Sequence, residues 1–438
     1  MLHTASFFAY LFPLALILER VRSRRVRVVL LVAANCVFLA SIAFSVLLAA
    51  LGVTVAVWAT ALLLGRLSRP SARNATFLAA LCMLGAIVFF KASSLSPEFS
   101  PLVGISFSFF CLPLIGYLAD VWSGKLAPER NPVSFAAFAT YFPVILSGPV
   151  TRAQNFLPQI EGSLERSRER LAEGAELVLR GLFKKLLLAD RLIDIEQAML
   201  QAGHGGQSLL LAPHFHLFMV RTYFDFSGYT DIARGVSLCF GFELPVNFDR
   251  PFVAVNPIDF WRRWHVSFSQ WLRDYLYYPL FFTTKRLHLC FLVTFLCNGL
   301  WHSLQWNFLF LGLFWSAMVS GYLVTKPWWD RLPGWGQVVL MWQIFAASFI
   351  FFEKDGIRTL QMALSGSGSL PAAAAAVADK VPGIILWLLL LAVYQALKRL
   401  LASNRGNVPI FLALVFVVIC FLYGLSIIGS PGYIYSQF

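Results

Sequence analysis

The sequence is short of charge. Asp, Glu, Lys and Arg make up 13% of its 438 residues, whereas soluble domains usually carry about 25%. Hydrophobic residues reach 58%, in runs of the length of roughly 20 residues that a spanning helix needs. A large water-soluble domain is thereby excluded. We expect an all-α polytopic membrane protein, with residues 1–438 forming one integral-membrane domain.

The familiar signatures of several enzyme classes are also missing. The seven cysteines form no CxxC pair, which excludes a disulfide framework or a cysteine zinc site. GxSxG, HExxH and P-loop patterns do not occur, and we expect no metal and no resident cofactor. The net charge of +13 is scattered between apolar runs. It indicates cytoplasmic loops and anionic lipid headgroups as partners and not nucleic acid.

Charge alternates along the N-terminal third as it does in a multi-pass protein. "ERVRSRRVR" (19–27) and "RLSRPSARN" (66–74) are basic, and "KASSLSPEFSP" (91–101) is nearly neutral. The basic loops should face the cytoplasm, which predicts an inner-membrane protein with an outward N-terminus. We expect no cleavable signal, because the first apolar run lacks a basic start and an A-x-A site. We expect about 11 transmembrane helices, at residues 5–18, 28–48, 50–65, 76–91, 102–121, 208–241, 287–303, 306–325, 336–352, 383–400 and 409–428.

Residues 152–191 differ from these runs because they are charged and prone to form helices. Apolar residues recur there at helical spacing among Glu and Arg. The pattern predicts amphipathic helices lying on the bilayer surface. A solvated connector explains the first half of the stretch equally well.

The stretch "DFWRRWHVSFSQWLRDYLYYPL" (259–280) concentrates basic and aromatic residues. If 261–278 is one helix, a polar face forms that is opposite to His265. The polar face would consist of Arg263, Ser267, Gln270 and Asp274. His265 would then point into protein, as a catalytic or a structural histidine. The arginines are equally typical of an interfacial aromatic belt with snorkelling side chains.

The second notable stretch is "CNGLWHSLQW" (297–306), within residues 287–325, which carry no Asp, Glu, Lys or Arg. Asn298, His302 and Gln305 have the spacing of one helix face. Ionisable groups at membrane depth usually line a cavity or a substrate path, and neutral imidazole is a general base. We therefore interpret His302 as a catalytic base, although a helix–helix hydrogen bond is the plainer alternative.

Taken in order, six motifs resemble the membrane-bound O-acyltransferase family. They are "VGISFSFFCLPLIGYLADVWSG" (103–124), "YFPVILSGPVTR" (141–152), "GLFKKLLLADRL" (181–192), "YFDFSGYTDIARGVSLCFGFELPVNFDRPF" (223–252), "FWRRWHVSFSQWLRDYLYYPL" (260–280) and "NGLWHSLQW" (298–306). The resemblance places a core at about residues 100–320. It implies re-entrant and interfacial helices around a central funnel or tunnel, a catalytic His302, and His265 as second functional position.

Within the family the chain is similar to bacterial members that modify cell-surface polymers. "FDFSGYTDIA" and "FWRRWH" resemble the alginate O-acetyltransferases, whereas "SGP" at 147–149 resembles the D-alanyl transferases of teichoic acid. "FFTTKR" after "YYPL" departs from the alginate pattern. The resemblance therefore implies transfer of an acetyl group to an exported polysaccharide, with D-alanyl transfer as the alternative.

Such a reaction needs a thioester donor, either acetyl-CoA or an acidic acyl carrier protein, at the cytoplasmic face. We expect the donor to dock on basic side chains, namely Arg262, Arg263, Arg273, Lys285 and Arg286. Substrate would be held by Asn298, Gln305, Trp301 and Trp264. The acceptor hydroxyl could lie on a glycan, or on an extracytoplasmic acyltransferase or polymer-synthesis partner.

Two other classes of protein remain open at this stage. A transporter would explain polar residues at membrane depth, including Asp225 and Asp231. However, no inverted repeat is evident, and Arg221 and Arg234 offer those carboxylates simple partners. A scaffold of an envelope polymer-export complex is the third possibility.

Overall fold

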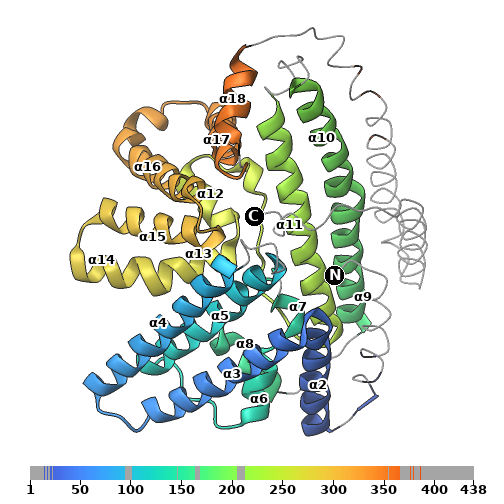
Figure 1. Ribbon diagram of the computed structural model, residues 1–438, viewed down its shortest axis with the longest axis vertical. Coiled ribbons are helices and arrows are strands. Elements are labelled where there is room, and N and C mark those ends of the chain that lie inside the picture. Colours follow the sequence, from blue (N-terminus) through green and yellow to red (C-terminus); the bar gives the residue numbers. More distant parts are fainter. Residues whose placement is uncertain are drawn as a thin grey trace.

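The computed structural model describes residues 23–93, 101–162, 168–204 and 213–365, except Leu146 and Lys354, and a few single positions elsewhere. Within those ranges the chain is helical and has no strand (Figure 1). The helices are α2 (Arg24–Ile42), α3 (Phe44–Leu64), α4 (Arg69–Ser93), α5 (Pro101–Trp122), α6 (Pro132–Ala139), α7 (Phe142–Ile145), α8 (Ala153–Glu161), α9 (Arg168–Leu182), α10 (Asp190–His204), α11 (His214–Cys239), α12 (Pro257–Arg263), α13 (Val266–Leu272), α14 (Tyr278–Thr284), α15 (Leu287–His302), α16 (Trp306–Trp329), α17 (Gly334–Ser348) and α18 (Gly356–Ser365).

Five helical segments are long and apolar enough to cross a membrane: Arg24–Ile42, Phe44–Leu64, Ser71–Phe89, Trp306–Trp329 and Gly334–Phe351. They confirm five predicted spans within one or two turns. The predicted spans at 102–121 and 287–303 include shorter apolar helices, Phe107–Trp122 and Leu287–His302. Those at 5–18, 383–400 and 409–428 lie outside the described ranges. The expected loop 19–27 is partly helical, since α2 begins at Arg24.

α16 shows why such a helix suits a bilayer. Trp306 at its start and Trp328 near its end are 77% and 69% exposed. At 1.5 Å per residue these two indoles lie about 33 Å apart along the axis, close to the roughly 30 Å thickness of the hydrocarbon layer. Exposed Trp residues gather at the two membrane interfaces. The chain thus has the aromatic ends that a spanning helix needs.

Residues 152–191 were predicted to form amphipathic helices, and their described part contains α8, α9 and the π-helix that continues α9, η1 (Phe183–Ala189). α9 packs lengthwise against α11 (Figure 1). A Cβ at Gly174 would lie 2.8 Å from the Gly235 carbonyl oxygen, and one at Gly181 2.5 Å from that of Gly228. Glycine at these crossing points lets two backbones touch, as small residues do between membrane helices.

This helix pair encloses charges that pair with one another. Lys185, 1% exposed, contacts the carboxylates of Asp190 at 2.7 Å and Asp225 at 2.9 Å. The carboxylate of Asp231 accepts hydrogen bonds from Arg180 at 2.9 Å and Lys184 at 2.8 Å.

The partners expected for the two aspartates were Arg221 and Arg234. The structure instead pairs Arg221 with Glu196 from α10. Sequence spacing on α11 favoured a partner one turn away, whereas the tight α9–α11 contact brings lysines from the neighbouring helix closer.

Candidate active site

His265 lies at a break between two helices. The prediction of one continuous helix over 261–278 is wrong, because α12 ends at Arg263 and α13 begins at Val266. His265 adopts a left-handed backbone conformation with φ 44°, which is uncommon for a residue other than glycine. Farther on, Arg273–Tyr277 is a π-helix. The break changes the direction of every side chain that follows.

Ser267 shows the consequence of this break. It was predicted on a water-facing polar surface with Arg263, but it is 4% exposed. Its Oγ accepts a hydrogen bond from the Val150 backbone N–H at 2.8 Å and donates to Asn247 Oδ1 at 2.7 Å. The prediction that His265 points into protein is confirmed, since it is 2% exposed.

Asn247 holds the segment that contains His265. Its backbone carbonyl accepts from the Val266 N–H at 2.9 Å. Its Oδ1 lies 3.2 Å from the Ser267 N–H and 3.2 Å from His265 Nδ1. A backbone N–H can only donate, so the Asn247 oxygen is fixed as the acceptor, and Nδ1 of His265 must carry the hydrogen. Nε2 of His265 is buried and has no hydrogen-bond partner among the described residues.

Aromatic rings from four helices surround this imidazole. The ring centroids of Phe226 on α11 and Phe268 on α13 lie 4.7 Å and 4.9 Å from that of His265. Trp301 on α15 and Phe109 on α5 follow at 6.2 Å and 6.3 Å. Burial lowers the pKa of His265 well below its usual range, and the neighbouring His302 lowers it further. The imidazole is therefore neutral at ordinary pH.

His302 is the last residue of α15. Asn298, one turn earlier, is 2% exposed, and its side-chain oxygen has no hydrogen-bond partner in the described part of the chain. His302 is itself only partly buried, and its ring contacts Trp301 at 4.9 Å and Phe352 at 5.5 Å. A helix C-terminus stabilises positive charge, which suits a side chain that gains a proton during a reaction.

Gln305 does not share this face, contrary to the prediction. Ser303 is extended, with φ −157° and ψ 155°, so α15 ends before Gln305, which is exposed and precedes α16. The last turn of α15 also touches the first turn of α16. A Cβ on Gly299 would overlap the Phe308 carbonyl oxygen of α16.

The two tryptophans named as substrate ligands have different surroundings. Trp301 lies between the histidines and packs on Phe268, with ring centroids 4.3 Å apart. Trp264 is 8% exposed, and its ring packs on Phe248 and Phe345 at 4.9 Å and 4.8 Å. The structure therefore places Trp301 in the site and Trp264 in the aromatic core beneath it.

The five basic residues predicted to dock the donor do not form one surface. Arg263 contacts Asp259 at 2.9 Å, and Arg273 contacts Asp274 at 2.8 Å. Arg262, Lys285 and Arg286 are exposed. Lys285 and Arg286 form the α14–α15 turn, at the left edge of Figure 1 and away from α12.

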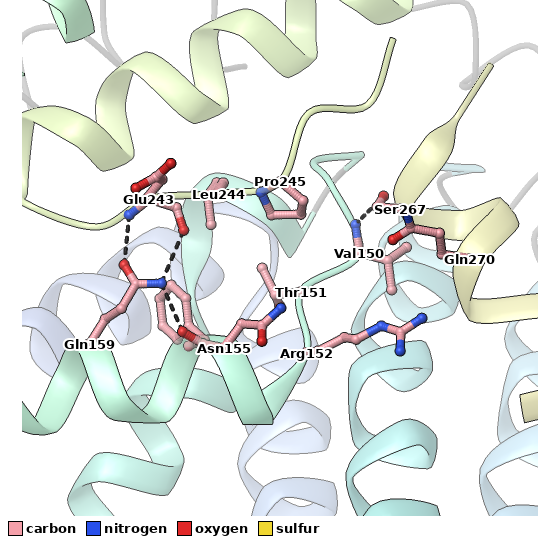
Figure 2. Close-up of a pocket in the computed structure, with 11 residues that line it drawn as sticks. Val150, Thr151, Arg152, Asn155, Gln159, Glu243, Leu244, Pro245, Ser267 and Gln270 are labelled. Atoms are coloured by element: carbon pink, nitrogen blue, oxygen red, sulfur yellow. Dashed lines mark hydrogen bonds between the residues drawn. The ribbon is translucent and has the colours of Figure 1, made fainter. Parts of the chain in front are cut away.

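We call His265, His302, Asn247, Asn298 and Trp301 the histidine centre. A small cleft opens beside it (Figure 2). Ser267 and Gln270 bound one end, and Gln159 on α8 bounds the other, where it exchanges hydrogen bonds with the Glu243 backbone at 2.7 Å and 3.1 Å. Its cavity volume of about 40 Å³ holds a few water molecules. Neither histidine lines it, but Ser267 connects it to Asn247 and so to His265.

The described ranges contain no group of three His, Cys, Asp or Glu residues placed to hold a metal ion. His214 and His216 have separate partners, Glu353 and Gln343, each at 3.0 Å. The polar groups around His265 and His302 thus offer base and hydrogen-bond chemistry.

The family model of MBOAT, the membrane-bound O-acyltransferase family, matches residues 74–357, well over half of the chain. The chain belongs to the membrane-bound O-acyltransferase family. Every residue of the histidine centre falls within the matched range. Family membership, together with the apolar helices, also makes this a multi-pass membrane protein.

Relatives of this chain carry names that refer to three different polymers. The probable alginate O-acetylase AlgI of Azotobacter vinelandii is 37% identical over 216 residues, which cover 48% of this chain and 42% of the relative. The peptidoglycan O-acetyltransferase of Helicobacter pylori is 26% identical over 298 residues, 60% and 56% of the two chains. The teichoic acid D-alanyltransferase of Bacillus subtilis is 29% identical over 203 residues, 44% and 51%. The chain spans about half the length of the curated relatives it matches.

Sequence reasoning missed Asn247 altogether. It lies inside the motif "LPVNFDRPF", but its place beside His265 depends on a contact between residues 18 positions apart. The one available signal was its position as an uncharged polar residue between apolar neighbours in an acyltransferase motif.

Proposed function

We propose that the chain transfers an acyl group, acetyl in the first instance, from a cytoplasmic thioester to a hydroxyl of an exported or cell-surface polysaccharide, in the bacterial inner membrane. The observation that carries the proposal is the pairing of two unlike histidines. His302 is partly accessible at a helix C-terminus, and His265 is neutral and enclosed by rings. Trp301 contacts both.

In this mechanism His302 removes the proton from the acceptor hydroxyl, and the oxygen attacks the thioester carbonyl carbon. The C–S bond then breaks, and His302 returns the proton to the departing thiolate. General-base assistance of this kind contributes about 10²–10⁴-fold in rate. The location of His302 favours the role, because the end of α15 stabilises the imidazolium that forms transiently.

Other groups near His302 would bind and orient the reactants. The Asn298 side chain is buried one turn from His302, so its amide could donate a hydrogen bond to the developing oxyanion. The indole N–H of Trp301 is a second donor of the same kind. The Nε2 lone pair of His265 would accept a hydrogen bond from a substrate hydroxyl.

The donor side is proposed to be the end of the molecule with exposed basic residues. Lys285 and Arg286 directly precede α15, and His302 is its last residue. The length of the helix separates them by about 24 Å. A coenzyme A thioester or an acidic acyl carrier protein carries its acyl group on an extended arm, which suits this separation. We place the reaction in a funnel or tunnel between the faces of the membrane, formed by about 11 spanning helices and shorter re-entrant ones.

Transfer of D-alanyl is the second candidate, because a relative named teichoic acid D-alanyltransferase matches the chain at 29% identity. The two functions share the same centre and differ in the acyl group. Parallel assays with acetyl and D-alanyl thioesters would distinguish them.

The deciding experiment is turnover of an acyl thioester by the purified protein with polysaccharide as acceptor. His302→Ala should lower turnover by about 10²–10⁴-fold and leave the yield of folded protein unchanged. His288→Ala, on the exposed start of the same helix, is the matched control. A protein that never turns over thioester would instead be a transporter or a scaffold.

A further inference from the structure

The backbone around His265 is held in a conformation that its sequence does not favour. A left-handed histidine costs energy and persists only where its surroundings enforce it. Here both residues that follow are tied to Asn247, Val266 through its N–H at 2.9 Å and Ser267 through its N–H at 3.2 Å and its hydroxyl at 2.7 Å. The same Asn247 oxygen faces His265 Nδ1 at 3.2 Å. The Asn247 side chain thus contacts both Ser267 and the imidazole, and its main-chain carbonyl holds Val266 between them.

We infer that Asn247 is a positioning residue that keeps His265 as the neutral tautomer with hydrogen on Nδ1, so that Nε2 offers its lone pair to the acceptor hydroxyl. This inference rests on the proposed acyl transfer. If the imidazole could rotate or change tautomer, its nitrogen facing the acceptor hydroxyl would sometimes be a hydrogen-bond donor and sometimes an acceptor. Since the Asn247 oxygen is held by the Ser267 N–H, which can only donate, only one tautomer satisfies the contact.

Among the described residues, rings and not charged side chains surround the His265 imidazole. The groups that face it from α5, α11, α13 and α15 are the rings of Phe109, Phe226, Phe268 and Trp301. The titratable group that acts on it is His302. Asn247 itself is uncharged and 1% exposed, so it orients the ring without attracting a second proton. A carboxylate at this position would do the opposite.

That difference provides the test. In Asn247→Asp the carboxylate can still accept the three hydrogen bonds, but it stabilises an imidazolium. An opposite charge beside a titratable group shifts its pKa by about 1–3 units. Protonated His265 has no lone pair, so the titration of His265, followed in a ¹⁵N spectrum, should move to higher pH by about 1–3 units. Asn247→Leu removes the acceptor and should lower kcat by about 10–100-fold at every pH.

The control variant is Ser269→Ala. Ser269 lies on α13 as Ser267 does, but its hydroxyl donates to the Trp264 carbonyl at 3.1 Å and not to Asn247. It should keep the His265 titration and the turnover of the unaltered protein. An Asn247→Asp variant in which the titration of His265 does not move would overturn the inference, because a merely structural asparagine predicts loss of stability without that shift.

A spectrum gives a reading independent of turnover. The protein has seven histidines, and ¹⁵N labelling of histidine with His265→Gln as reference identifies the signal of His265. We expect Nδ1 protonated and Nε2 unprotonated, and a mixture of tautomers in Asn247→Leu. A hydrogen on Nε2 of the unaltered protein would overturn the inference. Absence of thioester turnover by the unaltered protein would overturn the proposed function, while the spectrum still decides the tautomer.

Discussion

α11 separates two regions that bury polar groups in opposite ways. Phe226 faces the histidine centre, where its ring lies 4.7 Å from His265, whereas its neighbour Asp225 faces Lys185 at 2.9 Å. The first region contains neutral groups among rings, and three of their atoms lack hydrogen-bond partners within the described residues, namely His265 Nε2, Asn298 Oδ1 and Asn247 Nδ2. The second contains full charges that neutralise one another.

This difference distinguishes polar groups that are buried to stabilise the fold from polar groups that are buried to bind a substrate. A buried ion pair costs desolvation and recovers part of that cost from its partner, and the charges around Lys185 are neutralised without any ligand. A buried acceptor without a partner costs free energy that nothing in the folded chain returns. A substrate hydroxyl could return it. We therefore infer that the side of α11 that faces His265 carries the reaction. The side that faces Lys185 stabilises the fold.

The largest effect is expected from Lys185→Met. It would leave the carboxylates of Asp190 and Asp225 buried without their cation, which costs about 3–5 kcal/mol. Thermal unfolding in detergent measures the loss. Lys184→Met is the matched control, because Asp231 keeps Arg180 at 2.9 Å. If Lys185→Met instead kept full stability and lost turnover per folded molecule, the charged side would belong to the catalytic machinery.

Gly299→Ala should affect the histidine side instead. The new methyl group would overlap the Phe308 carbonyl oxygen and push α15 away from α16 beside His302. Overpacking costs about 1–3 kcal/mol, and a displacement of about 1 Å at a reacting group can cost about 10²-fold in rate. Turnover per folded molecule is the measurement. Gly321→Ala on α16, where a Cβ meets nothing within 4 Å, should behave as the unaltered protein, and equal losses in the two variants would contradict this account.

The dependence of stability on pH sharpens the comparison. The pKa of His265 is lower in the folded than in the unfolded protein, through burial and His302. Between these two pKa values the unfolded state binds more protons, so stability is fully present above pH 6.5 or so and falls as pH decreases. The slope approaches about 1.4 kcal/mol per pH unit for one proton. Unfolding temperatures from pH 7.5 to 5.5 measure it. His265→Gln should lose this slope and His288→Gln should keep it.

How far the sequence predicts this molecule depends on the range of the contacts involved. Apolar runs are local, so the predicted spans of α2, α3, α4, α16 and α17 agree with the structure. His265 was correctly predicted to be buried, although the helix on which that reasoning depended is broken at that residue.

The errors have a common physical cause. Periodicity continues a helix until something interrupts it, and the interruptions here are long-range. Asn247 ties down residues 265–267, and α15 ends at His302 where its last turn packs against α16. The partners of Asp225 and Asp231 likewise come from other helices. No pattern within one segment carries that information.

The smallest effect concerns the exposed basic residues, which belong to neither region. Arg263 and Arg273 are paired with Asp259 and Asp274, so reversing them would break ion pairs and confuse docking with folding. Arg262→Glu and the double variant Lys285→Glu with Arg286→Glu change exposed positions instead. Exposed charges alter encounter more than chemistry and are screened over about 8 Å at physiological ionic strength.

We therefore expect KM for the thioester donor to rise by up to about fivefold at low salt, which is roughly 1 kcal/mol, while kcat stays within about twofold. Added salt should weaken the unaltered protein in the same direction. Lys125→Glu, exposed in the α5–α6 turn, reports on net charge alone. If it raises KM as much as the double variant does, the α14–α15 turn has no special part in docking. If only the double variant raises KM, the donor docks at the α14–α15 turn. Its acyl arm must then extend along α15 to reach His302.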